Sequence, residues 1–299
     1  MKNLILTNDK YKNHELMFQQ WLDILGYSSS SVYNLPNHVR EFLWFLEQRR
    51  VNIMSDITTA IYDQYYLYLQ QRSNTRRGGG LSDAYLNKHV QALVKFVQFL
   101  RQTQQVILPP LTIPWVEPAV DNITVLTEDE IRILFAGCDH TQSNEHIKYR
   151  DKVMLVIFYS CGLRRNEGYH INVDDINLDN NILHVRKGKM YKQRFVPFTA
   201  ASADIIQLWL YDHRPNLVKT SSEPAFFISE RGERLTAQAM AVRLRLLQYH
   251  CEISTPLRLH VLRHSIATHL LQRGMSLEMI SQFLGHGSLV STQVYTHLV

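Results

Sequence analysis

Four short clusters in the second half of the sequence hold side chains that could act on a phosphate ester. They are CGLRRNE at Cys161 to Glu167, RKGKMYKQR at Arg186 to Arg194, HVLRH at His260 to His264, and LGH at Leu284 to His286 followed by Tyr295. Each cluster alone has an ordinary explanation. An arginine pair after an apolar helix is usually a solvated charge, a lysine-rich hairpin is usually a soluble turn, and many tyrosines are packing residues.

Together, the clusters supply what cleavage of a phosphodiester by a side chain requires: a nucleophile, cations for the non-bridging oxygens and a proton source. Tyr295 could be the nucleophile. A phenol with a pKa near 10 is only about one part in a thousand ionised at neutral pH, so it needs nearby positive charge or a base. Arg164 and Arg263 offer planar forks that match phosphate in two-point contact.

Proton transfer could also come from the chain itself. His260 and His286 could exchange protons with phosphoryl oxygens, and Lys189 could reach the leaving 5′ oxygen. No trio of carboxylates suggests Mg²⁺, and arginines can neutralise charge as a metal does elsewhere, so we expect no metal and no cofactor. Metal-dependent hydrolysis is the competing interpretation, because His260 and His264 are four residues apart, but no matching acidic or cysteine ligand lies nearby.

The order and spacing of the clusters resemble the tyrosine recombinase (phage-integrase-like) family, and within it the two-domain Xer-type enzymes. The resemblance covers essentially the whole chain. The matching pieces are GLRxxE at Gly162 to Glu167, GK and KxRxVP within Gly188 to Pro197, HVLRHSIATHLL at His260 to Leu271, and LGHGSLVSTQVYTH at Leu284 to His297. By position, the resemblance implies a catalytic set of Arg164, Lys189, His260, Arg263, His286 and Tyr295, with Glu167 supporting Arg164.

The resemblance also implies a reaction and a partner. The reaction would be site-specific recombination, in which DNA is cleaved and rejoined through a 3′-phosphotyrosyl intermediate and strand exchange, without ATP or metal. The partner would be a double-stranded DNA recombination site, bound by a homotetramer on paired sites, with a monomer away from DNA as one option. Two alternatives stay open: a non-catalytic DNA-binding protein of the same fold, and a type IB topoisomerase-like relaxing enzyme.

The sequence departs from the family pattern in three places. Arg165 and Asn166 stand where a small or apolar residue and a serine are more usual. Met190 stands where a glycine often follows the hairpin lysine, which weakens the assignment of Lys189. The alternatives to Lys189 are Lys187 and Lys192. The sequence ends four residues after Tyr295, where relatives commonly have a further helix, so we expect a longer natural chain or another means of linking subunits.

The elements that must position these residues fall into two predicted domains. Residues 1–105 contain four segments with apolar residues at helical spacing, at residues 14–25, 35–48, 61–70 and 84–100. In the second segment, Asn34 could cap the helix and Pro36 would lie in its first turn. Four prolines within residues 106–121 exclude both a helix interior and a central strand, and therefore predict an extended linker.

The second predicted domain covers residues 122–299. Thr127 followed by Glu130 fits a capping box and predicts a helix there. Ile182 to Arg186 and Arg194 to Val196 predict a strand pair around a Gly/Lys-rich turn. The expected fold class is mainly α with a small β-hairpin or sheet: an N-terminal four-helix core-binding domain and a C-terminal mixed α/β catalytic domain of the tyrosine recombinase type.

Polar residues on the last helix of the first domain are candidates for DNA contact. Asn87, Gln91 and Lys95 follow at i, i+4 and i+8, with Lys88 beside them, and such a stripe could enter a major groove. Taken alone, the stripe is better explained as a solvated helix face. The glycine-rich loop before this helix carries Arg76 and Arg77, which suit phosphate contact, although it could be a plain surface loop.

Overall composition is compatible with this interpretation without requiring it. The net charge of +5 is mild, and 45% hydrophobic residues are ordinary for a globular protein. The longest clear apolar run, Val153 to Tyr159, suits a buried helix or strand and is far short of the roughly 20 residues that span a bilayer. With no export signal and three cysteines that form no CxxC pair, we expect a cytoplasmic, nucleoid-associated protein.

Overall fold

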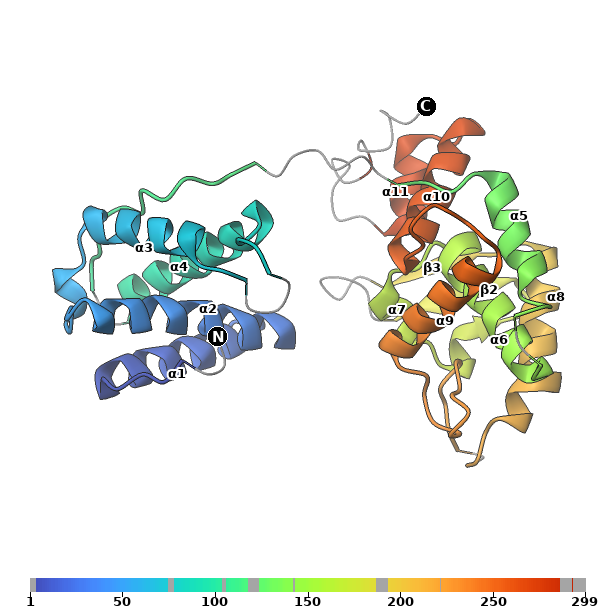
Figure 1. The fold of residues 1–299 in the computed structure, drawn as a ribbon. Coiled ribbons are helices and arrows are strands. Elements are labelled where there is room, and N and C mark those ends of the chain that lie inside the picture. The colour runs from blue at the N-terminus through green and yellow to red at the C-terminus, as the bar shows by residue number, and fades with distance from the viewer. Residues whose placement is uncertain are drawn as a thin grey trace. The chain divides into compact units, whose positions relative to one another are not determined.

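The computed structural model describes residues 4–74, 78–103, 106–117, 124–141, 143–186, 193–220, 222–285 and residue 292. The chain divides into two compact units, residues 1–121 and 122–299 (Figure 1). Helices predominate, and the second unit holds one three-stranded antiparallel sheet among its described residues. The predicted fold class is therefore confirmed. Within the described ranges, no helix is both long and apolar enough to cross a membrane.

Four helices build the first unit: α1 (Asp9–Ile24), α2 (Ser29–Gln48), α3 (Thr59–Gln71) and α4 (Asp83–Thr103), with a short 3-10 turn at Met54–Asp56. The predicted start of the second helix was wrong. The Ser28 hydroxyl accepts a hydrogen bond from the Ser31 amide and caps α2 six residues earlier than Asn34 would. Pro36 consequently lies inside the helix, not in its first turn.

The proline-rich segment after α4 packs against the first unit. Leu108 and Ile113 are buried in the same core as the aromatic rings of α1, α2, α3 and α4. The Asn87 amide pairs with the backbone of Val116, donating to its carbonyl oxygen at 2.6 Å and accepting from its N–H at 3.1 Å. Two apolar anchors and a two-point amide pair thus fix residues 106–117 to this unit.

The second unit has a sheet in the order β1-β2-β3, formed by Ile176–Asn177, Ile182–Val185 and Arg194–Pro197. The predicted strand pair is confirmed, since Leu183 lies opposite Val196 in the β2–β3 register. The helices are α5 (Glu128–Gly137), α6 (Glu145–Leu155), α7 (Arg165–His170), α8 (Ala200–Leu208), α9 (Ala237–His250), α10 (Leu259–Gln272) and α11 (Leu277–Leu284). Shorter helical turns lie at Val156–Ser160, Val173–Asp175, Trp209–His213 and Arg214–Asn216.

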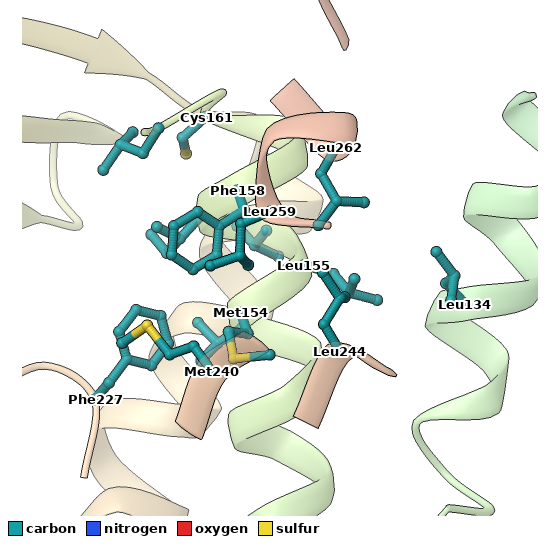
Figure 2. Close-up of a cluster of buried hydrophobic side chains, with 14 of the residues drawn as sticks. Leu134, Met154, Leu155, Phe158, Cys161, Phe227, Met240, Leu244, Leu259 and Leu262 are labelled. Atoms are coloured by element: carbon teal, nitrogen blue, oxygen red, sulfur yellow. The ribbon is translucent and has the colours of Figure 1, made fainter. Parts of the chain in front are cut away.

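The core of the second unit is assembled around α6. Its apolar side chains and those of α9 and α10 form one buried cluster, which Figure 2 shows, including Met154, Leu155, Met240, Leu244, Leu259 and Leu262. The predicted capping box at the start of α5 is confirmed: the Thr127 hydroxyl accepts from the Glu130 amide, and the Glu130 carboxylate accepts from the Thr127 amide. This core fixes the start of α10 relative to the end of α6.

Candidate active site

A π-helical turn positions Arg164 in the site. After α6 the chain continues through a π turn at Val156–Ser160, closed by a hydrogen bond from the Cys161 amide to the Val156 carbonyl oxygen at 2.9 Å. Gly162 then adopts φ +61°, and a Cβ there would lie 2.8 Å from Cδ2 of Leu284. Only glycine allows this backbone to approach α11 so closely, and Arg164 is then the N-cap residue of α7.

Helix α10 carries His260 and Arg263 in its first turns, one turn apart. Arg263 is 3% exposed. Its Nη1 donates to the carbonyl oxygen of Gly162 at 2.6 Å, and its Nη2 donates to that of Leu284 at 2.7 Å. The guanidinium of Arg263 therefore ties the end of the π turn to the end of α11.

The buried carboxylate of Glu167 lies between the arginines. Its Oε1 accepts from Nη1 of Arg164 at 2.8 Å, and its Oε2 accepts from the Arg164 amide at 2.8 Å. Arg194, on β3, donates Nη1 to Oε1 at 3.1 Å and Nη2 to Oε2 at 3.0 Å. Nη1 of Arg263 is 3.8 Å from Oε2. One carboxylate thus holds two guanidiniums and lies beside a third.

The end of α11 completes the cluster. Three successive carbonyl oxygens accept from three different arginines: Phe283 from Nε of Arg194 at 3.0 Å, Leu284 from Nη2 of Arg263 at 2.7 Å, and Gly285 from Nη2 of Arg164 at 3.0 Å. Carbonyls in the last turn of a helix lack helical partners and carry partial negative charge. The arginines supply the missing donors, so they gather directly before position 286.

Three titratable groups around the cluster have lowered pKa values, each for its own reasons. Burial would raise the pKa of Glu167, but hydrogen bonds and charge from Arg194, with hydrogen bonds from Arg164, hold it below its ordinary value. Partial burial lowers the pKa of His260 below 6.5, and the charges of Arg165, Arg263 and Arg164 lower it further. Burial, followed by His260 and Arg263, lowers the pKa of His264 to about 4.

The structure brings together some of the residues that the sequence singled out. Arg164, Arg263 and Glu167 share one hydrogen-bonded cluster, and His260 lies within electrostatic reach of both arginines. Sequence reasoning missed Arg194, although it stands within the KxRxVP piece. Seven other predicted or alternative positions lie outside the described residues: Arg76, Arg77, Lys187, Lys189, Lys192, His286 and Tyr295.

The candidate groove-reading stripe on α4 needs one correction. Asn87 is buried, and its amide is engaged by Val116, so it does not offer a base-reading group in this structure. Lys88 and Gln91 are exposed, and Lys95 is half-buried with its Nζ donating to Gln98 Oε1 at 3.1 Å. The outward stripe is therefore Lys88, Gln91 and Lys95.

Side chains suited to a metal ion do not gather in the described ranges of the chain: no three His, Cys, Asp or Glu residues lie close enough to form a site. His260 and His264 lie in the positive field of the arginines, which disfavours a cation there. The three cysteines are free thiols. The described site thus offers cationic donors for an anion.

Comparison with known proteins agrees with this geometry. The sequence profile of the phage integrase family matches residues 124–299, more than half of the chain. The chain therefore belongs to the phage integrase family. It is 29% identical over 296 residues to tyrosine recombinase XerC of Bacillus subtilis (strain 168), covering 97% of this chain and 93% of that protein.

Two further likenesses extend the comparison. Tyrosine recombinase XerD of Oceanobacillus iheyensis is 32% identical over 223 residues, which cover 73% of each chain. The solved structure of XerH site-specific recombinase bound to difH substrate, a pre-cleavage complex, matches with a TM-score of 0.73 at 19% identity, over 96% of this chain and 81% of that one. The structural likeness shows a shared fold.

Proposed function

We propose that the protein is a site-specific DNA recombinase that cleaves and rejoins DNA through a 3′-phosphotyrosyl intermediate and strand exchange. The observation that carries the proposal is the convergence of Arg164 and Arg263 on successive carbonyl oxygens at the end of α11. Guanidiniums from two separate elements, held beside each other, suit the two non-bridging oxygens of one phosphate. Family membership supports the same activity.

In the proposed reaction, the phenol oxygen of Tyr295 attacks the phosphorus of the scissile phosphate. A bond forms between that oxygen and phosphorus, and the bond to the 5′ oxygen breaks, with Lys189 as the proton donor to the leaving oxygen. Arg164 and Arg263 neutralise the charge on the non-bridging oxygens. The released 5′-hydroxyl of a partner strand reverses the step, so the number of phosphodiester bonds is conserved and no ATP is consumed.

Proton exchange with the phosphoryl oxygens is assigned to His260 and His286. The lowered pKa of His260 keeps its imidazole neutral at neutral pH, so it could accept the phenol proton. Glu167 orients Arg164, because its carboxylate accepts hydrogen bonds from both the side chain and the backbone amide of Arg164. These roles come to His260, His286 and Glu167 by position within the family motifs.

For the whole chain, the proposed division is a DNA core-binding domain at residues 1–105, a linker at 106–121 and a catalytic domain at 122–299. Lys88, Gln91 and Lys95 would face the groove, and Arg76 and Arg77 would contact phosphates. The partner is a double-stranded recombination site, with a homotetramer on paired sites, in the cytoplasm at the nucleoid. The difH-bound XerH structure supports the assignment of DNA as the partner.

A nicked suicide duplex tests the proposal, because the short strand diffuses away after cleavage and traps the covalent adduct. The wild-type protein should form a protein–DNA adduct, and Tyr295→Phe should bind the duplex without forming one. Tyr249→Phe is the matched control, since Tyr249 is 79% exposed on α9 and should leave the adduct intact.

Other outcomes would point elsewhere. An adduct that persists in Tyr295→Phe would identify a different nucleophile. Binding without any adduct in the wild type would indicate a non-catalytic DNA-binding protein. An adduct with relaxation of supercoils but no Holliday junctions on paired sites would indicate a relaxing enzyme.

A further inference from the structure

Arg194 uses every nitrogen of its guanidinium inside the protein. Nη1 and Nη2 form a fork-to-fork pair with the two carboxylate oxygens of Glu167, and Nε donates to the carbonyl oxygen of Phe283. Its side chain is 10% exposed. All three guanidinium nitrogens of Arg194 therefore donate to protein groups, on Glu167 and Phe283.

Of the two groups that Arg194 holds, Glu167 is bonded directly to Arg164, and the Phe283 carbonyl directly precedes the two carbonyls that hold Arg263 and Arg164. Glu167 binds the side chain and the amide of Arg164. The two residues after Phe283 supply carbonyl oxygens to Arg263 and Arg164. Arg194 is therefore linked to Arg164 through Glu167, and to both Arg164 and Arg263 through the backbone at the end of α11.

Because of these bonds, Arg194 and Arg164 share the negative charge of the Glu167 carboxylate. A carboxylate bound on both oxygens by Arg194 leaves Arg164 to contribute one Nη1 bond and its backbone amide. Without the fork of Arg194, the same carboxylate could take Arg164 in a two-point pair. The guanidinium N–H groups of Arg164 that suit a phosphate would then donate to Glu167 instead.

Close packing keeps Arg194 against the end of α11. Gly285 has φ +65°, and a Cβ there would lie 2.8 Å from Cδ and 2.9 Å from Nη1 of Arg194. The backbone of Gly285 therefore rests directly on the arginine side chain. A shift of Arg194 would be transmitted to Gly285, whose carbonyl oxygen accepts from Nη2 of Arg164.

We infer that Arg194 is a positioning residue for phosphodiester cleavage: it orients Glu167 and the end of α11, and through them Arg164 and Arg263. The inference rests on the proposed function. It concerns the rate of the chemical step and not the affinity for DNA, because the guanidinium of Arg194 donates its hydrogen bonds to Glu167 and to the end of α11.

Arg194→Lys tests this role, since lysine keeps the charge but cannot bridge both Glu167 oxygens and the Phe283 carbonyl. Single-turnover cleavage of the nicked duplex should be measured across DNA concentrations. We expect the maximal rate to fall roughly 10- to 100-fold, as for a slight misplacement of reacting groups, with the half-saturating DNA concentration unchanged within about twofold. Hydrogen exchange should quicken in the α11 peptide, residues 277–285, relative to the α10 peptide.

Arg214→Lys is the matched control, because Arg214 also holds backbone carbonyls, those of Glu223 and Ala225, but bonds to neither Glu167 nor α11. It should keep the wild-type maximal rate. If Arg194→Lys does not fold, Gly285→Ala retains the arginine but sets a methyl group 2.8 Å from its Cδ, so the Arg194 side chain must shift. The same loss of maximal rate at unchanged half-saturation is expected.

Three results would overturn the inference: wild-type rates in Arg194→Lys, a loss of DNA affinity equal to the loss of rate, or an equal loss of rate in Arg214→Lys. Failure of the proposed function looks different. In that case the wild-type protein itself forms no adduct, whereas failure of the inference alone leaves the wild-type adduct intact.

Discussion

Arg263 donates from Nη2 to the carbonyl oxygen of Leu284 at 2.7 Å, and both residues are buried. The bond joins the first turns of α10 to the last turn of α11. Arg263 is therefore oriented by the protein before any DNA is present. Donors that are oriented in advance need no reorganisation when charge develops on a phosphate, which is the usual origin of electrostatic catalysis.

Arg263→Lys should keep the positive charge at this position but remove the two-point orientation of the side chain. A single ammonium cannot serve both the Gly162 and Leu284 carbonyl oxygens, so cleavage of the nicked duplex should slow roughly 100- to 1,000-fold. Leaving one buried acceptor unpaired should also lower the free energy of unfolding by about 1–3 kcal/mol, measured by urea denaturation. Arg273→Lys, at the exposed ion pair with Glu128, is the control and should change both quantities little. Equal effects of the two substitutions would contradict the assignment.

The lowered pKa of Glu167 predicts how stability depends on pH. A carboxyl whose pKa is depressed by folding stabilises the fold above its unfolded pKa, and this stabilisation is lost as the pH falls through the folded value. Glu167→Gln should therefore unfold at lower urea than the wild type at pH 7. The difference should shrink as the pH falls below the ordinary glutamate pKa, about 4.3, towards the lower folded value, and should vanish below it. Glu233→Gln, at an exposed position, serves as the control. A difference in stability between Glu167→Gln and the wild type that grows as the pH falls would contradict the prediction.

His260 should titrate below an unperturbed histidine because partial burial and three arginines act on it. Arg165 is the foremost of those charges, so Arg165→Gln should raise the pKa of His260, followed by the ring-proton shift in NMR. If neutral His260 accepts the phenol proton, the acid limb of the cleavage profile should move up with it. Arg231→Gln, exposed and not among the causes, is the comparison. An unchanged or lower midpoint in Arg165→Gln would refute the account.

On α4, neighbouring residues should give opposite results. Asn87→Ala removes both partners of the Val116 backbone and should lower the stability of the first unit by about 1–3 kcal/mol. Lys88→Ala should leave urea denaturation unchanged and reduce the slope of log affinity against log salt by about 1, as for one lost phosphate contact. If Asn87→Ala changed the slope of log affinity against log salt without loss of stability, Asn87 would belong to the residues that face DNA.

Apolar spacing predicted α4 because that pattern reports which face of a helix is buried, and the strand pair was predicted from two segments that flank a Gly/Lys-rich turn. The same spacing could not assign the outward stripe. Eight residues along a helix turn the chain about 80° beyond two full turns, so Asn87 and Lys95 do not share one line. The partner of Asn87 is the backbone of Val116, and a backbone partner leaves no signature in side-chain sequence.

Arg194 was missed for a related reason. Its partners are a main-chain carbonyl and a carboxylate already assigned to Arg164, and both lie far from it in sequence. The arginine's place in the KxRxVP piece was the available signal. The early start of α2 is different: four serines precede Val32, and the first of them, Ser28, is the cap, whereas the sequence prediction placed the cap at Asn34.

The π turn at Val156–Ser160 sets a strict requirement on chain length. Removing one residue would restore ordinary helical winding and rotate the downstream backbone by about 100°, carrying Gly162 away from Leu284 and Arg164 away from Gly285. A deletion scan through these five positions should abolish the covalent adduct each time, whereas apolar exchanges of equal volume should spare it. The number of residues in this turn therefore matters more than which apolar side chains they carry.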